Sequence, residues 1–335
     1  MKLAKVIPIF KKGDPCNVCN YRPISLLTSI SKILEKIVYS RTIKFLKVNN
    51  IFCETQFGFR EKHNTSHAIL TFLDKVARAT DNHDHTIGVL FDFSKAFDTI
   101  NHDILLYKLC HYGIRGIALK WFESYLCNRQ QFVCINNSNS SVKNVCCGVP
   151  QGSILGPLLF ILYINDFRNS SKLLSFLLFA DDSNIFYSHH DPQLLLNTLN
   201  TELLIVADWI KSNKLSLNLD KTNYMLFSNA IDYLPGQIMF DNIPLKRVHY
   251  SKFLGIIIDE DLTWKPHINN VCTIVSRNIG IINKLKLCFP KTTLLTLYYA
   301  LIYPYLNYGI LAWGNACKTL LDRILLLQKK SPENN

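Results

Sequence analysis

Three aspartates in the middle of the chain follow apolar runs that have the character of buried strands. Residues 88–91 run directly into Asp92, and residues 177–180 run into Asp181 and Asp182. If the two strands are neighbours in one sheet, the three carboxylates converge, and their desolvation and mutual repulsion call for a cation. Oxygen ligands without an accompanying His or Cys suit Mg²⁺, which keeps several waters and binds through carboxylates and substrate phosphates.

Several kinds of chemistry are open to such a carboxylate cluster. Two metal ions about 3.5–4 Å apart can activate an attacking 3′-hydroxyl and stabilise a leaving pyrophosphate, which is nucleotidyl transfer. The same carboxylates could equally serve a nuclease or a phosphatase. A purely structural role for Asp181 and Asp182 is a turn in which their side chains bond nearby backbone amides. Against that role stands the conjunction of three carboxylates at strand ends, in the only acidic third of a basic chain.

The distribution of charge divides the chain into three parts. Its 335 residues include 37 Lys and Arg against 25 Asp and Glu. The net charge is +9 over residues 1–78, −2 over residues 79–200 and +5 over residues 201–335. Basic flanks favour a polyanionic partner, because Lys and Arg gain free energy by releasing the counterions condensed on a phosphate backbone. A basic solvated surface without a partner is the alternative interpretation.

The composition excludes several classes of protein. With 48% hydrophobic residues the chain can bury a sizeable core, so it is neither a disordered tail nor a collagen-like fibre. No apolar stretch approaches the ~20 residues needed to cross a bilayer, and the N-terminus lacks a signal-peptide core. We therefore expect an intracellular protein, nuclear or cytoplasmic, with no membrane partner and 11 reduced cysteines. Cys16 and Cys19 have zinc-like spacing, but no second Cys or His pair matches them.

The elements that position these residues can be predicted from periodicity. The pattern indicates an α+β fold, with helices on one face of an antiparallel sheet. Apolar residues three and four positions apart predict an amphipathic helix, with Ile30, Ile33, Leu34, Ile37 and Val38 on its apolar face. Further helices are expected at 65–80, 103–111, 117–126, 155–166, 193–213, 267–287 and 292–303. Strands are expected at 86–91, 173–180, 183–187, 224–227 and 253–258, with a hairpin loop at 136–141.

Seven segments resemble, in order, the successive motifs of the reverse transcriptases of non-LTR (LINE-type) retrotransposons, most closely the jockey or CR1 type. The resemblance spans nearly the whole chain, and seven ordered motifs are a far stronger signal than any single one. The segments are NYRPISLL at 20–27, QFGFR at 56–60, FDFSKAFD at 91–98, GVPQGSILGPLLF at 148–160, FADD at 179–182, LNLDKT at 217–222 and FLG at 253–255.

The resemblance implies a right-hand polymerase fold with fingers, a palm built on an antiparallel sheet, and a helical thumb. The fingers, with the first palm elements, would occupy residues 1–85, the palm residues 86–260 and the thumb residues 261–335. The palm would include interleaved helices, the hairpin 130–147 and a primer-holding hairpin near residue 253. Members of the family usually carry an upstream endonuclease and continue past the thumb, so the chain resembles a fragment or a decayed copy with a truncated thumb.

The resemblance also implies which residues perform the chemistry. Asp92 would bind two Mg²⁺ ions, for which Mn²⁺ could substitute; Asp181 would be the second metal-binding carboxylate, and Asp182 would lie beside them. Phe93 would ligate metal through its backbone carbonyl. Lys221 resembles a lysine that protonates the pyrophosphate leaving group, a role that needs proximity first and a suitable pKa second.

A second set of residues would bind the incoming nucleotide. Phe97 would stack under the sugar and leave no room for a 2′-hydroxyl, which favours deoxynucleotides. Gln151 and Gly152 would lie against the nascent base pair, where Gly allows a close approach of the backbone. Arg60 and Arg22 would face the triphosphate, because a guanidinium fork suits phosphate oxygens. Without the motifs, Phe97 is more typical of a core residue and either arginine of a surface residue.

The implied function is RNA-directed DNA polymerisation, in which a DNA primer or nicked target DNA is extended with dNTPs on an RNA template. A viral RNA-dependent RNA polymerase shares the palm chemistry, but Phe97 argues against ribonucleotide substrates. The non-enzymatic alternative is a truncated, inactive remnant of the polymerase fold that binds RNA. The three intact aspartates argue against loss of activity by mutation.

Overall fold

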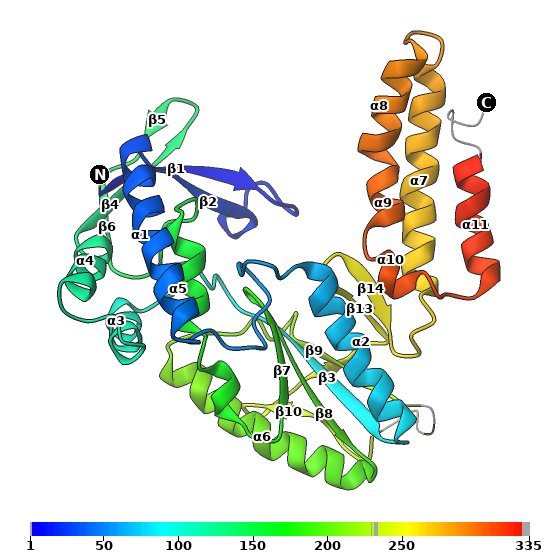
Figure 1. Cartoon of the computed structure of the whole chain (residues 1–335), viewed down its shortest axis with the longest axis horizontal. Coiled ribbons are helices and arrows are strands. Elements are labelled where there is room, and N and C mark those ends of the chain that lie inside the picture. The colour runs from blue at the N-terminus through cyan, green and yellow to red at the C-terminus, as the bar shows by residue number, and fades with distance from the viewer. Residues whose placement is uncertain (1, 229, 231–233, 330–335) are drawn as a thin grey trace.

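The computed structural model describes residues 2–228, 230 and 234–329. It has three parts (Figure 1). The N-terminal lobe contains a small sheet with helices α1, α3, α4 and α5 beside it; the central sheet lies between α2 and α6; and the C-terminal bundle contains α7 to α11. This arrangement confirms the predicted α+β class.

The elements have the following bounds. The helices are α1 Ser29–Val48, α2 Thr65–Asp81, α3 His102–His111, α4 Gly116–Leu126, α5 Leu155–Tyr163, α6 Pro192–Ser212, α7 Lys265–Leu285, α8 Lys291–Leu301, α9 Tyr303–Asn307, α10 Ile310–Trp313 and α11 Lys318–Lys329, with 3₁₀ turns at Val18–Asn20 and Phe167–Ser170. The strands are β1 Leu3–Phe10, β2 Tyr21–Leu26, β3 His85–Asp92, β4 Arg129–Ile135, β5 Ser138–Asn139, β6 Lys143–Val145, β7 Ser175–Phe179, β8 Asp182–His189, β9 Asn223–Phe227, β10 Met239–Phe240, β11 Ile243–Pro244, β12 Lys246–Arg247, β13 Tyr250–Phe253 and β14 Ile256–Asp259.

The central sheet has the strand order β12-β9-β3-β8-β7. All its neighbours are antiparallel except β12 and β9, which are parallel. Strand β3 is buried on both faces: Ile87 and Val89 join the core formed with α5 and α6, whereas Leu90 joins the core formed with α2. The prediction of helices on one face only is therefore wrong, because the near-continuous apolar run of β3 is typical of a strand covered on both sides.

The sheet of the N-terminal lobe joins segments that are far apart in the chain. Strand β1 pairs with β2 in antiparallel fashion and with β4 in parallel fashion, so that Leu3 lies opposite Gln130. The hairpin predicted at 130–147 therefore belongs to this sheet and not to the central one. The sequence patterns did not predict β1 or β2.

Helix α1 was predicted correctly as a helix, but the face it buries was not. Four residues of its predicted apolar face, Ile30, Ile33, Leu34 and Ile37, are exposed, and only the fifth, Val38, is partly buried against the core. Glu35 is only 1% exposed instead. Its Oε2 accepts hydrogen bonds from the backbone nitrogens of Ile154 (2.7 Å) and Leu155 (3.3 Å), where α5 begins without a side-chain cap of its own. A carboxylate at a helix N-terminus satisfies amides that have no partner within the helix, and this interaction sets the rotation of α1.

The remaining predicted elements agree with the structure to within a few residues, with one exception. The strand predicted at 253–258 is the hairpin β13–β14, because Leu254 and Gly255 both have positive φ and turn the chain. Over the described residues, no helix combines the length and apolar character that crossing a membrane would require.

Candidate active site

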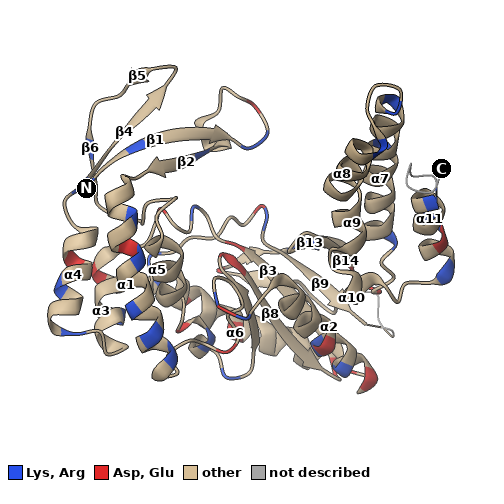
Figure 2. Ribbon diagram, turned by 45° about the horizontal axis from the view of Figure 1, so that its top comes forward, with Lys and Arg blue, Asp and Glu red and all other residues tan. Residues whose placement is uncertain are grey.

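Asp92, Asp181 and Asp182 lie at one end of the central sheet. Strands β3 and β8 pair in a register that places Asp92 directly opposite Asp182. Strand β7 ends at Phe179, and Ala180 (φ 57°) turns the chain so that Asp181 lies at the tip of the β7–β8 hairpin. In Figure 2 this end of the sheet faces the space between the N-terminal lobe and the C-terminal bundle. The predicted convergence of the three aspartates is therefore present in the fold.

The carboxylates repel one another. The pKa of Asp182 is raised to about 6, first because of desolvation by burial and then because of the negative charges of Asp181 and Asp92. In the part of the chain that the structure describes, no three His, Cys, Asp or Glu side chains are arranged to hold a metal ion. The nearest counter-charge to Asp92 is Lys221, whose Nζ lies 3.4 Å from Asp92 Oδ2 in an exposed ion pair. The site therefore holds excess negative charge that one exposed ammonium group offsets in part.

The segment 217–222 fixes the end of β3. The backbone nitrogen of Asn218 donates to the carbonyl oxygen of Asp92 at 2.8 Å, and the backbone nitrogen of Asp92 donates to Thr222 Oγ1 at 3.3 Å. Phe93 is buried and forms an isolated β-bridge with Leu217. The carbonyl of Phe93 is not part of the hydrogen bonds made by Asn218 and Thr222. Both backbone polar groups of Asp92 are thus engaged, and Lys221 is brought to its carboxylate by the same segment.

Gln56 supports the hairpin that carries Asp181. Its Oε1 accepts hydrogen bonds from the backbone nitrogens of Ala180 (3.0 Å) and Gly58 (2.8 Å). A Cβ at Gly58 would lie 2.3 Å from the nitrogen of Ala180, so only glycine allows this approach. Gln56 is 1% exposed and was not predicted as a site residue. The signal for it was an uncharged polar side chain directly before the apolar residues 57–59 of the motif at 56–60.

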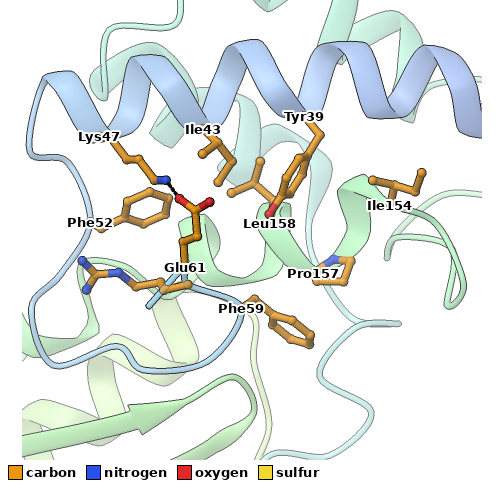
Figure 3. Close-up of a pocket in the computed structure, with 10 residues that line it drawn as sticks. Tyr39, Ile43, Lys47, Phe52, Phe59, Glu61, Ile154, Pro157 and Leu158 are labelled. Atoms are coloured by element: carbon orange, nitrogen blue, oxygen red, sulfur yellow. Dashed lines mark hydrogen bonds and ion pairs between the residues drawn. The ribbon is translucent and has the colours of Figure 1, made fainter. Parts of the chain in front are cut away.

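Arg60 lies in the loop after Gln56 and hydrogen-bonds within that loop. Its Nη1 donates to the carbonyl oxygens of Cys53 (2.7 Å) and Gln56 (3.1 Å), and its guanidinium lies over the ring of Phe52. It lines a pocket of about 500 Å³ between α1 and α5 (Figure 3), across which Lys47 and Glu61 form an ion pair. In this structure Arg60 closes its own loop, and a contact with a triphosphate stays a prediction.

Phe97 is half-buried between two other rings. Its ring centroid lies 4.6 Å from that of Phe160 on α5 and 6.5 Å from that of Phe59. These contacts hold the Phe97 ring in one position. A side chain that selects ligands by their shape has to be held in this way. Phe59 also lines the pocket that contains Arg60. The surroundings of Phe97 and the pocket of Arg60 are therefore adjacent.

Gln151 is held by its side chain and by its backbone. Its Nε2 donates to both carboxylate oxygens of Asp98 at 2.9 Å, and its carbonyl accepts a hydrogen bond from the nitrogen of Ser25 on β2 at 2.7 Å. Gly152 has φ 114°, and a Cβ there would lie 2.8 Å from the carbonyl oxygen of Ser25. Burial raises the pKa of Asp98, while the hydrogen bond from Gln151 and the charges of Lys95 and Lys11 act in the opposite direction.

A basic pocket of about 530 Å³ lies beside Gln151. It brings together Gln151 and Arg22, both predicted from sequence, with Asp98 and the ammonium-bearing Lys11 and Lys95. The oxygens of a phosphate group can accept hydrogen bonds from the side chains of Arg22, Lys11 and Lys95. Asp98, Lys11 and Lys95 were not predicted as site residues. Lys95 and Asp98 nevertheless belong to the motif at 91–98, from which Asp92 was predicted.

The β13–β14 hairpin is attached to the C-terminal bundle. The hydroxyl of Tyr308 donates to the carbonyl of Leu254 at 2.5 Å, and a Cβ at Gly255 would lie 3.0 Å from the Tyr308 ring. The turn and the bundle are therefore fixed relative to each other.

The model of the family "Reverse transcriptase (RNA-dependent DNA polymerase)" matches residues 9–258. The chain belongs to this family. Among curated relatives, the RNA-directed DNA polymerase from mobile element jockey of Drosophila melanogaster is 30% identical over 346 residues, which cover 98% of this chain and 37% of the relative. The probable RNA-directed DNA polymerase from transposon X-element of the same species is 29% identical over 98% of this chain and 37% of its own length. The predicted family is thus confirmed, and the chain spans 37% of the length of these relatives.

Solved telomerase structures share the fold. Telomerase from Candida albicans, in complex with the TWJ fragment of telomeric RNA, matches with a TM-score of 0.55 and 12% identity, over 98% of this chain and 63% of that one. Apo telomerase from Candida tropicalis matches with a TM-score of 0.52 and 11% identity, over 99% of this chain and 63% of that one. These likenesses confirm the predicted polymerase fold of this reverse transcriptase family member.

Proposed function

We propose that the chain is an RNA-directed DNA polymerase of a non-LTR mobile element, which extends a primer 3′-hydroxyl with dNTPs on an RNA template. The observation that carries the proposal is the register of β3 and β8, which places Asp92 opposite Asp182 beside Asp181 in a chain of the reverse transcriptase family. In the same proposal, residues 1–85 serve as fingers, 86–260 as palm and 261–335 as thumb.

The donor set of the site suits a hard divalent cation. The three carboxylates and the carbonyl of Phe93 offer only oxygen ligands. The raised pKa of Asp182 reflects burial first and then repulsion by Asp181 and Asp92, and a bound cation would offset both. We assign two Mg²⁺ ions to Asp92, Asp181, Asp182 and the Phe93 carbonyl, with Mn²⁺ as a substitute. When bound, the ions lower the pKa of the attacking hydroxyl and neutralise charge on the leaving pyrophosphate.

The chain's own residues supply the remaining steps. Lys221 Nζ lies 3.4 Å from Asp92 Oδ2, close enough to the reacting groups to give a proton to the departing pyrophosphate. The cations of Arg22, Lys11 and Lys95 bind the triphosphate in the basic pocket. The ring of Phe97, fixed by Phe160, occupies the space that a 2′-hydroxyl would need. Arg60 contributes by closing the loop that holds Gln56.

The proposed partners are an RNA template, a DNA primer or nicked target DNA, and dNTPs. Support comes from the basic flanks of the sequence and from the mobile-element polymerases that the chain resembles. The solved telomerase that carries an RNA fragment adds a polyribonucleotide partner on the same fold.

Primer extension on an RNA template tests the proposal. The intact chain should add dNTPs in the presence of Mg²⁺, and Asp181→Ala should lose at least about a thousandfold in rate. Asp74→Ala, at an exposed position of α2, should match the parent. Equal extension by the parent and Asp181→Ala would remove the proposed role of Asp181. Binding of RNA without extension by either protein would identify an inactive remnant, and equal use of ribonucleotides would identify an RNA polymerase.

A further inference from the structure

Helix α1 turns an apolar face to solvent. The side chains on this face are 44–64% exposed and pack against neither core of the described residues: Ile30, Ile33, Leu34 and Ile37. A surface helix normally buries its apolar side chains and presents polar ones to water. The reversal follows from Glu35, which is buried and accepts hydrogen bonds from the first amides of α5. A buried carboxylate thus sets the rotation of α1 and leaves its apolar face outward.

The exposed residues of α1 recur at regular intervals along the helix. Six of them follow one another in steps of four and three: Ile30, Leu34, Ile37, Arg41, Lys44 and Val48. We call these six residues the outer stripe. On an α-helix such steps give one continuous line, and two helices pack along a shared seam with this spacing. The outer stripe is about 27 Å long, because each residue adds ~1.5 Å, so it matches a partner helix of about five turns.

The charge on the exposed surface of α1 has one sign. The helix carries five exposed cations: Lys32, Lys36, Arg41, Lys44 and Lys47 (Figure 2). Glu35 is the single acidic residue between Ser29 and Val48, and it is buried. In the part of the chain that the structure describes, Lys47 pairs with Glu61, whereas the two cations of the outer stripe have no ion-pair partner. A partner that excludes water from the stripe must supply carboxylates to these two cations.

Other occupants fit this surface less well. A second copy, in a two-fold antiparallel arrangement centred on the stripe, would place Arg41 against Ile37 and Lys44 against Leu34. It would also bring two sets of cations together without an exposed acid on either helix. A nucleic acid would pair its phosphates with the cations but leave the isoleucines in water. A lipid surface would cover the isoleucines, but the two cations lie in the line of the stripe and would be drawn toward the acyl chains.

We propose that the outer stripe of α1 is a docking surface for an acidic amphipathic helix of a partner protein. The partner helix presents apolar residues, in steps of three and four, to the four apolar positions of the stripe. It presents carboxylates to Arg41 and Lys44. Helix α1 belongs to the N-terminal lobe, whereas the three aspartates lie at one end of the central sheet, so the docking surface does not depend on the proposed function.

Two synthetic helical peptides of about five turns test the surface on the intact chain. Both have leucines in steps of four and three; one has Glu and the other Lys at the positions that face Arg41 and Lys44. By fluorescence anisotropy, the parent should bind the Glu peptide at least about tenfold more tightly than the Lys peptide. Ile37→Asp should weaken binding of the Glu peptide at least about tenfold. Ile117→Asp, the same change at an 89% exposed position of α4, should leave it unchanged.

An exchange of charge tests the electrostatic part of the proposal. Arg41→Glu combined with Lys44→Glu should reverse the preference, so that the Lys peptide binds at least about tenfold more tightly than the Glu peptide. Arg115→Glu combined with Lys120→Glu, an equal change of charge on α4, should keep the preference of the parent. All the substituted side chains are exposed, so each variant should unfold cooperatively at the melting temperature of the parent.

Other results would overturn the proposal. Equal binding of the two peptides by the parent, or binding of neither, would refute an acidic helix as the occupant. Unchanged affinity in Ile37→Asp would place the peptide on another surface, and an unreversed preference after the charge exchange would refute the pairing with Arg41 and Lys44. If no peptide binds, a parent dimer that Ile37→Asp dissociates in analytical ultracentrifugation would identify a second copy instead. Binding to phosphatidylserine vesicles that Ile37→Asp abolishes would identify a lipid surface.

Discussion

The two groups of carboxylates in the centre of the molecule have opposite surroundings. Asp92, Asp181 and Asp182 repel one another, and among the described residues the cation that pairs with them is the exposed Lys221. Glu35 accepts two hydrogen bonds from the start of α5 and a third from Ser31 Oγ. Asp98 accepts two from Gln151, which offset in part the burial that raises its pKa. A carboxylate that accepts hydrogen bonds from the protein stabilises the fold, whereas a carboxylate without such partners is available to bind a ligand.

The largest expected effect separates activity from stability at Asp181. Asp181→Asn should lower primer extension by at least about a thousandfold, because the substitution removes a charge on which the reaction depends. Its free energy of unfolding should stay within about 0.5 kcal/mol of the parent or rise, because a repulsion is removed. Steady-state extension and urea unfolding check the two parts. A variant that unfolds more easily and keeps its rate would reverse the comparison.

Substitutions of Glu35 should lower the stability of the fold, in contrast to Asp181→Asn. Glu35→Ala should lower the free energy of unfolding by about 2 kcal/mol, because it strands buried amides at the start of α5, while Glu35→Gln keeps an acceptor and should cost about half as much. Lys36→Ala, on the exposed side of α1, should cost under about 0.5 kcal/mol. Urea unfolding of the three variants would contradict the assignment if Glu35→Ala and Lys36→Ala were equally stable.

The smallest expected effect is a dependence on pH at Asp182. Because its pKa is raised to about 6, its contribution to stability is full below the ordinary pKa of an aspartate and is lost as the pH rises through about 6. Neighbouring groups desolvate the Asp182 carboxylate in part, but the residue keeps contact with solvent, which screens its charge. We therefore expect the difference in unfolding free energy between Asp182→Asn and the parent to grow by less than about 1 kcal/mol between pH 4 and pH 7.5. A difference that does not change with pH would show that Asp182 is not repelled by its neighbours.

The same contrast explains what the sequence could predict. The strand-end aspartates follow apolar runs, so local pattern predicted their places at strand ends, as it predicted the helices around the central sheet. Their convergence depended on the further condition that the two strands are neighbours, which the pairing of β3 with β8 fulfils. The apolar face of helix α1 was predicted to be buried. Local pattern could not show that Glu35 accepts hydrogen bonds from backbone amides about 120 residues away. Gln56 and Asp98 were missed for the same reason, since their partners Ala180 and Gln151 lie far along the chain. Strand β1 pairs with β4 across more than a hundred residues, which no local periodicity reports.

The most direct test of the central claim counts the metal ions that the three aspartates hold. Mn²⁺ is titrated into the intact chain with an RNA template, a dideoxy-terminated DNA primer and the next dNTP, and bound Mn²⁺ is followed by electron paramagnetic resonance. The account predicts two ions for the parent and for Asp74→Asn, and fewer for Asp92→Asn and Asp181→Asn. Two ions bound with equal affinity by all four proteins would contradict it.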